Sequence, residues 1–313
     1  MLHYILRRAL STVPVMGIVA FLVFSLLYLA PGDPASVIAG EQASAADIEL
    51  IREQLGLDRP YLIRFGEWLW HIMRGDLGVS VFSSIPVTQL IVQRLEPTVS
   101  LMVYTLILSV LIAVPMGVLA AWKAGTSIDR AVMTFAVLGF SIPVFVIGYL
   151  LAYVMALKLG WFPVQGYAPL SSGIGPWLRS LTLPALALSC VYVALIARTT
   201  RATMLEVLNQ DYIKTARAKG LNQFPILFHH ALKNAAVPVV TVIGIGVALL
   251  IGGAVVTESV FVLPGLGRLT VDAILQRDYP VIQGVILLFS FLYIIINLIV
   301  DIVYTIVDPR IRY

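Results

Sequence analysis

A basic segment between two apolar runs holds the side chains best suited to polar chemistry. It runs from Gln210 to Asn234, reads QDYIKTARAKGLNQFPILFHHALKN, and contains three of the chain's five lysines. A lysine can cradle a phosphate when it follows glycine in a Gly-Lys-Ser or Gly-Lys-Thr loop whose backbone amides also bind. No lysine in the sequence follows a glycine. We therefore expect that the chain cannot hydrolyse ATP by itself.

The sequence also lacks the residue patterns of a metal site or of a common enzyme active site. On a helix, the adjacent His229 and His230 would point about 100° apart, so they could not form a two-ligand face for a metal ion. The single Cys190 excludes an intrachain disulfide and a cysteine cluster, and its apolar surroundings indicate a small buried residue. No Ser-His-Asp or His-Glu-x-x-His pattern stands out. We expect no metal ion and no catalytic residue in this chain.

The composition indicates that lipid forms part of the solvent around this chain. Of its 313 residues, 59% are hydrophobic and 12% are charged, and the mean hydropathy is +0.94. A soluble domain carries about 25% charged residues, so this much apolar surface points to a membrane. The net charge of +4 is small. No basic stretch alternates with aromatic residues that could stack on bases, so we expect no nucleic-acid partner.

Six runs without Asp, Glu, Lys or Arg predict six transmembrane helices. A helix needs roughly 20 residues to cross hydrocarbon, so each run can span, the fourth only just. The spans must be helical because lipid offers no partner to free backbone amides. The first run is longer than the apolar core of a signal peptide, about 7–15 residues, and is expected to stay as an anchor. The runs are Ala9–Ala30, Thr98–Trp122, Ala131–Leu157, Leu181–Ala197, Ala235–Thr257 and Val281–Val300.

The distribution of cations predicts that both ends of the chain are cytoplasmic. With the N-terminus inside, the short inside segments hold 12 of the 21 lysines and arginines. Five of the others lie in the outer segment Pro31–Pro97, and long segments cross a membrane largely regardless of charge. The predicted fold is therefore an all-α membrane protein with six transmembrane helices and both termini inside.

The outer segment between the first two spans is predicted to contain two short amphipathic helices. The first begins after Ser44, a suitable N-cap, and ends at Gly56. The second follows Pro60, which suits a first helical turn. They could lie on the outer membrane surface, cap the bundle, or belong to a packed outer domain. Their apolar stripes are Ile48, Ile51 and Leu55 in the first helix and Tyr61, Phe65, Trp68 and Ile72 in the second.

Two of the predicted spans carry small residues at every fourth position. Such stripes let helix backbones approach closely. Close packing, within the chain or against a partner, is one interpretation, and the lining of a path for a solute is another. The stripes are Ala113, Gly117 and Ala121 in the second span and Gly244, Ala248 and Gly252 in the fifth.

No predicted span has an Asp, Glu, Lys, Arg or His side chain in its interior. Proton-driven carriers usually place such groups inside the membrane because they relay the proton. Their absence argues against proton coupling. A sodium-coupled secondary carrier that binds the ion with backbone oxygens stays open as an alternative, as does a membrane scaffold without transport.

Within the basic segment, the sequence predicts a short cytoplasmic helix from Asp211 to Gly220. Asp211 can cap the N-terminus, Gly220 fits the position after the C-terminus, and cations crowd the later turns, where they suit the helix dipole. Because it has only about eight residues, the helix would be marginal alone in water. It must dock on a partner protein or on anionic lipid. The apolar contact would come from Tyr212, Ile213 and Ala216.

Eight short motifs follow one another along the whole chain. They are LRR near the start, APGDP (Ala30–Pro34), LGLDRP (Leu55–Pro60), GDLGVS (Gly75–Ser80), DYIKTARAKGL (Asp211–Leu221), LPGLGRL (Leu263–Leu269), RDYPVIQG (Arg277–Gly284) and DPRIRY at the end. In this order the motifs resemble the permease subunits of bacterial ABC importers of the dipeptide and oligopeptide branch, which normally have six spans. The general coupling-loop motif of such permeases, Glu-Ala-Ala followed by Gly and Ile-x-Leu-Pro, is retained only at Ala216, Gly220 and Leu232.

The resemblance implies a role in the bacterial inner membrane. A second, homologous permease subunit would complete the channel, two ATP-binding subunits would dock inside and use ATP and Mg²⁺, and an extracytoplasmic solute-binding protein would deliver the solute. This chain would bind no cofactor itself. Closure of the ATP-binding subunits would be transmitted through the short helix, whose contacts must differ between two states. The implied coupling residues are Asp211, Tyr212, Ile213, Thr215, Ala216, Arg217, Ala218, Lys219, Gly220 and Leu221.

The charges after the fifth span form a second candidate site. A zwitterionic solute would meet fixed charges only near the ends of the spans, and the LPGLG turns could fold this segment back over the bundle. The segment could act as a gate or could be an ordinary exterior loop. The candidate gate residues are Glu258, Arg277 and Asp278.

The chain is thus predicted to have four parts. They are the N-terminal tail with the first span (1–30), an extracytoplasmic segment (31–97), a five-helix core (98–307) with the coupling loop (198–234), and a cytoplasmic tail (308–313). Members of the resembled branch take up dipeptides, longer peptides, glutathione, nickel or other solutes. The motifs do not separate these solutes, and we expect the binding protein to select among them.

Overall fold

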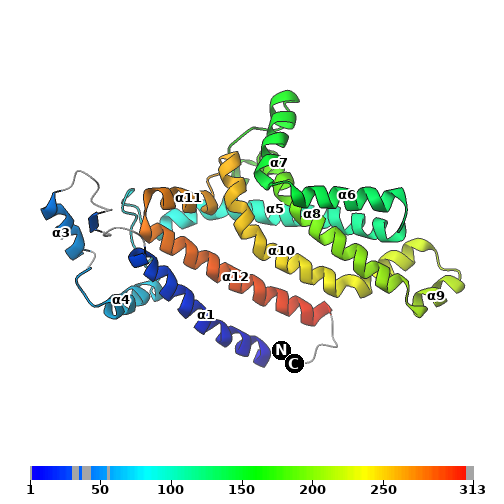
Figure 1. Ribbon diagram of the computed structural model, residues 1–313, viewed down its shortest axis with the longest axis horizontal. Coiled ribbons are helices and arrows are strands. Elements are labelled where there is room, and N and C mark those ends of the chain that lie inside the picture. Colours follow the sequence, from blue (N-terminus) through cyan, green and yellow to red (C-terminus); the bar gives the residue numbers. More distant parts are fainter. Residues whose placement is uncertain (1, 30–34, 37–43, 55–56, 308–313) are drawn as a thin grey trace. The chain divides into compact units, whose positions relative to one another are not determined.

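The protein is helical throughout the part that the structure describes. The computed structural model describes residues 2–29, 35–36, 44–54 and 57–307. Within these ranges no strand occurs, and one isolated β-bridge joins Val79 to Pro86. Figure 1 shows α1 (Leu2–Leu29), α3 (Ala45–Gln54), α4 (Tyr61–Met73), α5 (Val87–Trp122), α6 (Ser127–Ser141), α7 (Val144–Leu151), α8 (Ile174–Leu208), α9 (Asp211–Ala218), α10 (Leu232–Phe261), α11 (Leu266–Gln276) and α12 (Tyr279–Val307). Three shorter elements are the π-helical turns η1 (Ala152–Lys158) and η3 (Pro225–Ala231) and the 3₁₀ turn η2 (Leu170–Ser172).

The chain divides into two compact units, and each is described by itself. Unit 1 consists of Met1–Leu95 and Arg268–Ile295. Unit 2 consists of Glu96–Gly267 and Ile296–Tyr313. Unit 2 therefore contains α6 to α10 and most of α5, whereas α3 and α4 belong to unit 1.

Among the described residues, four helices are long and apolar enough to cross a membrane on their own. Their apolar stretches have mean hydropathies of 2.0 to 2.6. They match the second, fourth, fifth and sixth predicted spans, which confirms the helical multi-pass membrane architecture. The described apolar part of α1, Leu10–Leu26, is shorter than a span, so the count of six and the orientation stay predictions. The four are Val87–Trp122, Ile174–Leu208, Pro225–Phe261 and Tyr279–Val300.

The third predicted span, Ala131–Leu157, is broken in the structure. It is divided into α6 and a second helix formed by α7 and η1, with a bend of 104° between them. The break lies at Ile142 and Pro143, because the proline ring disfavours a helical conformation in the preceding residue. Ile142 accordingly has φ −89° and ψ 127°. Figure 1 shows α7 turning away from α6. This region counts as a fifth span only if a bent pair crosses the membrane.

Helix α8 is the central helix of unit 2. Its apolar stretch is 72% buried, whereas those of the other three long helices are at most 33% buried. It packs against α6, α7 and α10, and Leu181, Leu188 and Ile196 lie in a core that α8 shares with α5, α7 and α10. The three less buried long helices present many apolar side chains to their surroundings, as expected where lipid is the solvent.

The small-residue stripes differ from each other in what they contact. The α5 stripe packs closely on α8, since a Cβ at Gly117 would lie 2.7 Å from the carbonyl oxygen of Ala197. In α10, a Cβ at Gly244 would meet Val300, but Gly252 is exposed and has nothing within 4 Å. Close packing within the chain is therefore found at Gly244 and not at Gly252, where packing against a partner and the lining of a path for a solute both stay open. Gly253, one position later, faces Leu188 of α8 instead, at 2.6 Å from a built Cβ.

In unit 1, α4 packs its aromatic stripe on α1. The ring centroids of Phe65 and Trp68 lie 5.5 and 5.2 Å from that of Phe24. The hydroxyl of Tyr61 lies 2.6 Å from that of Ser25. The second predicted helix of this segment is confirmed as a helix whose stripe covers another helix of this chain, and its location outside the membrane stays a prediction.

The first predicted outer helix also exists. α3 begins directly after Ser44, whose carbonyl accepts a hydrogen bond from the Ile48 amide at 3.1 Å. Its predicted end, at Leu55 and Gly56, lies outside the described residues.

Gly117, which is closely packed, and Gly252, which is open, provide a matched test of helix packing. We expect Gly117→Ala to destabilise the protein by about 1–3 kcal/mol, because the added methyl group overpacks the contact with α8. Gly252→Ala should be neutral or slightly stabilising, because alanine favours helix and the site is open. Thermal unfolding of both variants in one detergent measures the difference. Equal melting temperatures for the two variants would contradict the observed packing.

Candidate functional site

Helix α9 is the predicted short helix, with one change at its start. The N-cap position is occupied by Gln210, which has an extended backbone and makes no side-chain capping bond. The prediction that Asp211 is the cap is therefore wrong by one residue. Asp211 instead lies in the first turn, where a negative charge suits the helix dipole, and it accepts a hydrogen bond from Lys214 Nζ at 2.8 Å.

The C-terminus of α9 is closed by Gly220. Its φ of +79° is left-handed, a conformation that glycine adopts without the steric cost of a Cβ. The Gly220 amide donates to the carbonyl of Arg217 at 2.9 Å, and the Leu221 amide donates to that of Ala216 at 3.2 Å. This pair of bonds is a Schellman motif, which satisfies carbonyls that the helix end leaves free.

Ile213 anchors α9 to the rest of unit 2. Its side chain is fully buried. The sequence places it in a contact with an outside partner, but the structure turns it inward. It lies in the α9 cluster, a group of buried side chains from the ends of α5, α8, η3 and α10. The α9 cluster consists of Val118, Ala121, Met204, Leu208, Ile213, Ile226, Leu227, Ala231 and Ala235.

The remaining predicted coupling residues form an open face. Ala216 is half-buried, and Tyr212 keeps its ring exposed while its hydroxyl accepts a hydrogen bond from Asn234 Nδ2 at 3.0 Å. The exposed members of this face are Asp211, Tyr212, Thr215, Arg217, Ala218, Lys219, Gly220 and Leu221. Cations and small residues thus face outward at one end of unit 2, next to the ends of α8 and α10 (Figure 1).

An exposed aromatic pair extends this face beyond α9. Phe224 is 69% exposed and Phe228 is 40% exposed, and their ring centroids are 4.6 Å apart. Pro225, which follows Phe224, begins the π-helical turn η3, and Phe228 lies within that turn. The sequence analysis did not single out this pair. A phenylalanine one residue before a proline, in a basic segment, was the available signal.

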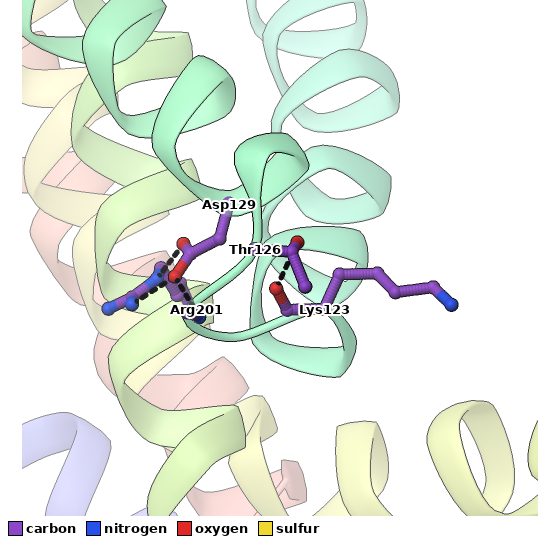
Figure 2. Close-up of polar contacts among 5 residues, drawn as sticks. Lys123, Thr126, Asp129 and Arg201 are labelled. Carbon is purple, nitrogen blue, oxygen red and sulfur yellow. Dashed lines mark hydrogen bonds and ion pairs between the residues drawn. The ribbon is translucent and has the colours of Figure 1, made fainter.

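An ion pair between buried Asp129 and partly buried Arg201 joins the start of α6 to α8. The carboxylate of Asp129 accepts hydrogen bonds from Nε and Nη2 of Arg201, at 2.5 and 2.7 Å, and from the Gly125 amide at 2.9 Å. Figure 2 shows both carboxylate oxygens turned toward the guanidinium group. Asp129 precedes the apolar run Ala131–Leu157. No short sequence pattern links these two residues, which are 72 positions apart.

The first candidate gate residue, Glu258, is buried beneath the LPGLG loop. Its carboxylate accepts a hydrogen bond from the Thr98 hydroxyl at 2.6 Å, and the same hydroxyl oxygen accepts one from the Leu266 amide at 2.8 Å. A Cβ at Gly265 would collide with the Glu258 carboxylate, so only glycine lets the loop lie over it. The gate hypothesis and the exterior-loop alternative both suppose that Glu258 faces solvent. The structure shows that it does not.

The other two candidate gate residues lie in unit 1. Asp278 is buried, and its carboxylate accepts hydrogen bonds from the Ser80 hydroxyl at 2.5 Å and from the Val81 amide at 3.4 Å. Arg277 is exposed and has a left-handed φ of +57°. Asp278 thus fastens the start of α12 to the segment before α5, and of the three candidates only Arg277 presents its charge to solvent.

Comparisons with known proteins agree on one family. Residues 1–102 match the N-terminal region of the membrane component of binding-protein-dependent transport systems, and residues 113–313 match the inner membrane component of these systems. A probable peptide ABC transporter permease protein of Sinorhizobium fredii is 56% identical over 310 residues, 99% of each chain. The glutathione transport system permease protein GsiC of Salmonella choleraesuis is 44% identical over 313 residues, the whole of both chains.

Solved structures support the same fold. A chain of the MetNI methionine ABC transporter in an inward-facing conformation superposes with a TM-score of 0.59 and 20% identity, over 70% of this chain and 97% of that chain. The protein is therefore a member of the family of binding-protein-dependent transport system inner membrane components.

Proposed function

We propose that this chain is a permease subunit of an ATP-driven importer that takes up peptides or a related small solute. The observation that carries the proposal is α9, a short helix fixed from inside by Ile213, closed by Gly220, and open to a partner along its outer face. Relatives named as peptide and glutathione permeases support the class of solute. The selection among such solutes belongs to the binding protein.

The partners follow from this role. A second permease completes the path, two ATP-binding subunits supply ATP hydrolysis with Mg²⁺, and an extracytoplasmic solute-binding protein delivers the solute. The outer face of α9 binds one ATP-binding subunit. Arg217 and Lys219 favour an acidic rim on that subunit, and Leu221 and Phe224 favour an apolar pocket inside the rim.

Of the three candidate gate residues, Glu258 and Asp278 are buried, so the proposed gate is reduced to Arg277. Glu258 and Asp278 hold their segments in place through buried hydrogen bonds. Arg277 is the residue of the three that a solute or a binding protein can meet. Its left-handed backbone holds the side chain at the turn before α12.

The C-terminal end of α9 offers a direct test of coupling. Gly220→Val should uncouple ATP hydrolysis from uptake, because a β-branched residue in the left-handed region costs roughly 1–2 kcal/mol and opens the Schellman motif. Gly220→Asn is the matched control, since asparagine tolerates this conformation, and it should retain most of the uptake. Uptake and ATPase activity are measured in proteoliposomes. Normal transport by the valine variant would contradict the proposal.

The predicted orientation can be tested by labelling. In a Cys190→Ala background, Ser44→Cys should react with an impermeant thiol reagent added outside intact cells, and Asn222→Cys should react only after the cells are opened. Both parent residues are exposed, so access within the protein is not limiting. Labelling of Asn222→Cys but not of Ser44→Cys in intact cells would contradict the predicted orientation and indicate the opposite one.

The proposal that Arg277 acts as a gate residue can be tested by substitution. Arg277→Gln should alter uptake or raise ATPase activity in the absence of binding protein, with assembly intact. Arg277→Lys, which keeps the charge, should behave as the wild type does. If both variants match the wild type in both assays, Arg277 is an ordinary exterior residue.

A further inference from the structure

We propose that Asp129 and Arg201 are positioning residues for coupling. Their ion pair holds the end of α8 that carries α9 to the start of α6, so that a displacement of α9 passes to the bent helix formed by α6 and α7. The inference rests on the proposed function of α9, and it concerns residues outside the coupling segment itself.

The geometry of the pair makes it a directional link. Each carboxylate oxygen of Asp129 accepts from one nitrogen of the same guanidinium group, and the Gly125 amide adds a third hydrogen bond. A bidentate contact of this kind fixes the relative orientation of the two side chains as well as the distance between them. The Asp129 side chain is 5% exposed and that of Arg201 is 28% exposed, so water screens the pair only weakly.

The turn that presents Asp129 is itself held in shape. Gly125 has a left-handed φ of +79°. The Thr126 hydroxyl donates to the carbonyl of Lys123 at 2.6 Å, which Figure 2 shows beside the ion pair. Thr126 is the N-cap of α6, and Asp129 lies in the first turn of that helix. The carboxylate is therefore placed by the α5–α6 turn and does not depend on a flexible loop.

On the other side, Arg201 belongs to the arm that leads to α9. α8 continues from Arg201 to Leu208, about two helical turns. Met204 and Leu208 on this stretch are buried in the α9 cluster with Ile213. A force on α9 is thus carried through packed side chains to the α8 end, and the ion pair is the polar contact there that reaches α6.

The receiving element has a built-in break. α6 runs from Ser127 to Ser141 and then meets the 104° bend at Ile142 and Pro143. α6 also packs along α8, with Gly139 close to the Cys190 carbonyl, and the ion pair adds a directional polar contact at its start. α6 can therefore follow α8 as one rigid rod as far as that break. The pair would then connect the ATP-driven movement to the one bent helix among the candidate spans of the described residues.

A charge-exchange experiment separates positioning from simple fastening. The complex of permeases and ATP-binding subunits is purified with Asp129→Asn, with Arg201→Lys, or with Asp129→Arg and Arg201→Asp together. It is then reconstituted with its binding protein. Asparagine can still accept from the Gly125 amide but loses the charge. The main readout is the solute imported per ATP hydrolysed in complexes that retain their ATP-binding subunits. Fastening alone would change the amount of assembled complex and would leave this ratio unchanged.

We expect both single variants to lower the ratio by about fivefold or more, the scale of typical coupling between sites, and the exchanged pair to recover much of it. Arg179→Lys is the matched control, because Arg179 is an exposed arginine on the same helix and lies outside the coupling loop, and it should keep the wild-type ratio. Single variants that assemble poorly but keep the wild-type ratio in the complexes that do assemble would contradict the proposal, as would an exchanged pair that recovers neither assembly nor ratio.

Two results would overturn different statements. A wild-type ratio in assembled Asp129→Asn complex would contradict this inference and leave the proposed function intact. Failure of the wild-type chain to retain any ATP-binding subunit would contradict the proposed function itself.

Discussion

The burial of Ile213 is the contact on which the rest of the candidate site depends. An isolated helix of eight residues is unstable in water, because its few hydrogen bonds do not offset the cost of ordering the chain. Ile213 supplies the missing stabilisation by entering the α9 cluster. Since that cluster also contains the ends of α5, α8 and α10, α9 cannot move without moving them. The short helix α9 is therefore fixed to the ends of α5, α8 and α10.

Three buried carboxylates also connect parts of the structure. Asp129, Glu258 and Asp278 are all buried, and each accepts hydrogen bonds that compensate for its loss of water. Each joins segments that are far apart in the sequence. These three buried carboxylates therefore connect helices and loops inside the protein, whereas Arg217 and Arg277 are exposed.

The sequence predicts those features that rest on local chemistry. Apolar length locates the long helices, and a glycine after a capped basic stretch locates the end of α9, because both follow from the geometry of one helix. The features that it misses depend on distant residues. The inward turn of Ile213 requires the α9 cluster, and the burial of Glu258 requires the loop at Gly265 to fold over it. The bend before Pro143 carried a readable signal, which an unbroken apolar run concealed.

Cysteine crosslinking along α9 tests most directly the claim that this helix binds an ATP-binding subunit. Single cysteines replace Ile213, Thr215, Arg217 and Ala218 in turn, in a chain without Cys190, and the assembled complex is treated with a short thiol-to-amine crosslinker. The account predicts crosslinks to the ATP-binding subunit from the three exposed positions and none from position 213, which is buried. A complex that retains its ATP-binding subunits but gives no crosslink from any exposed position of α9 would contradict it.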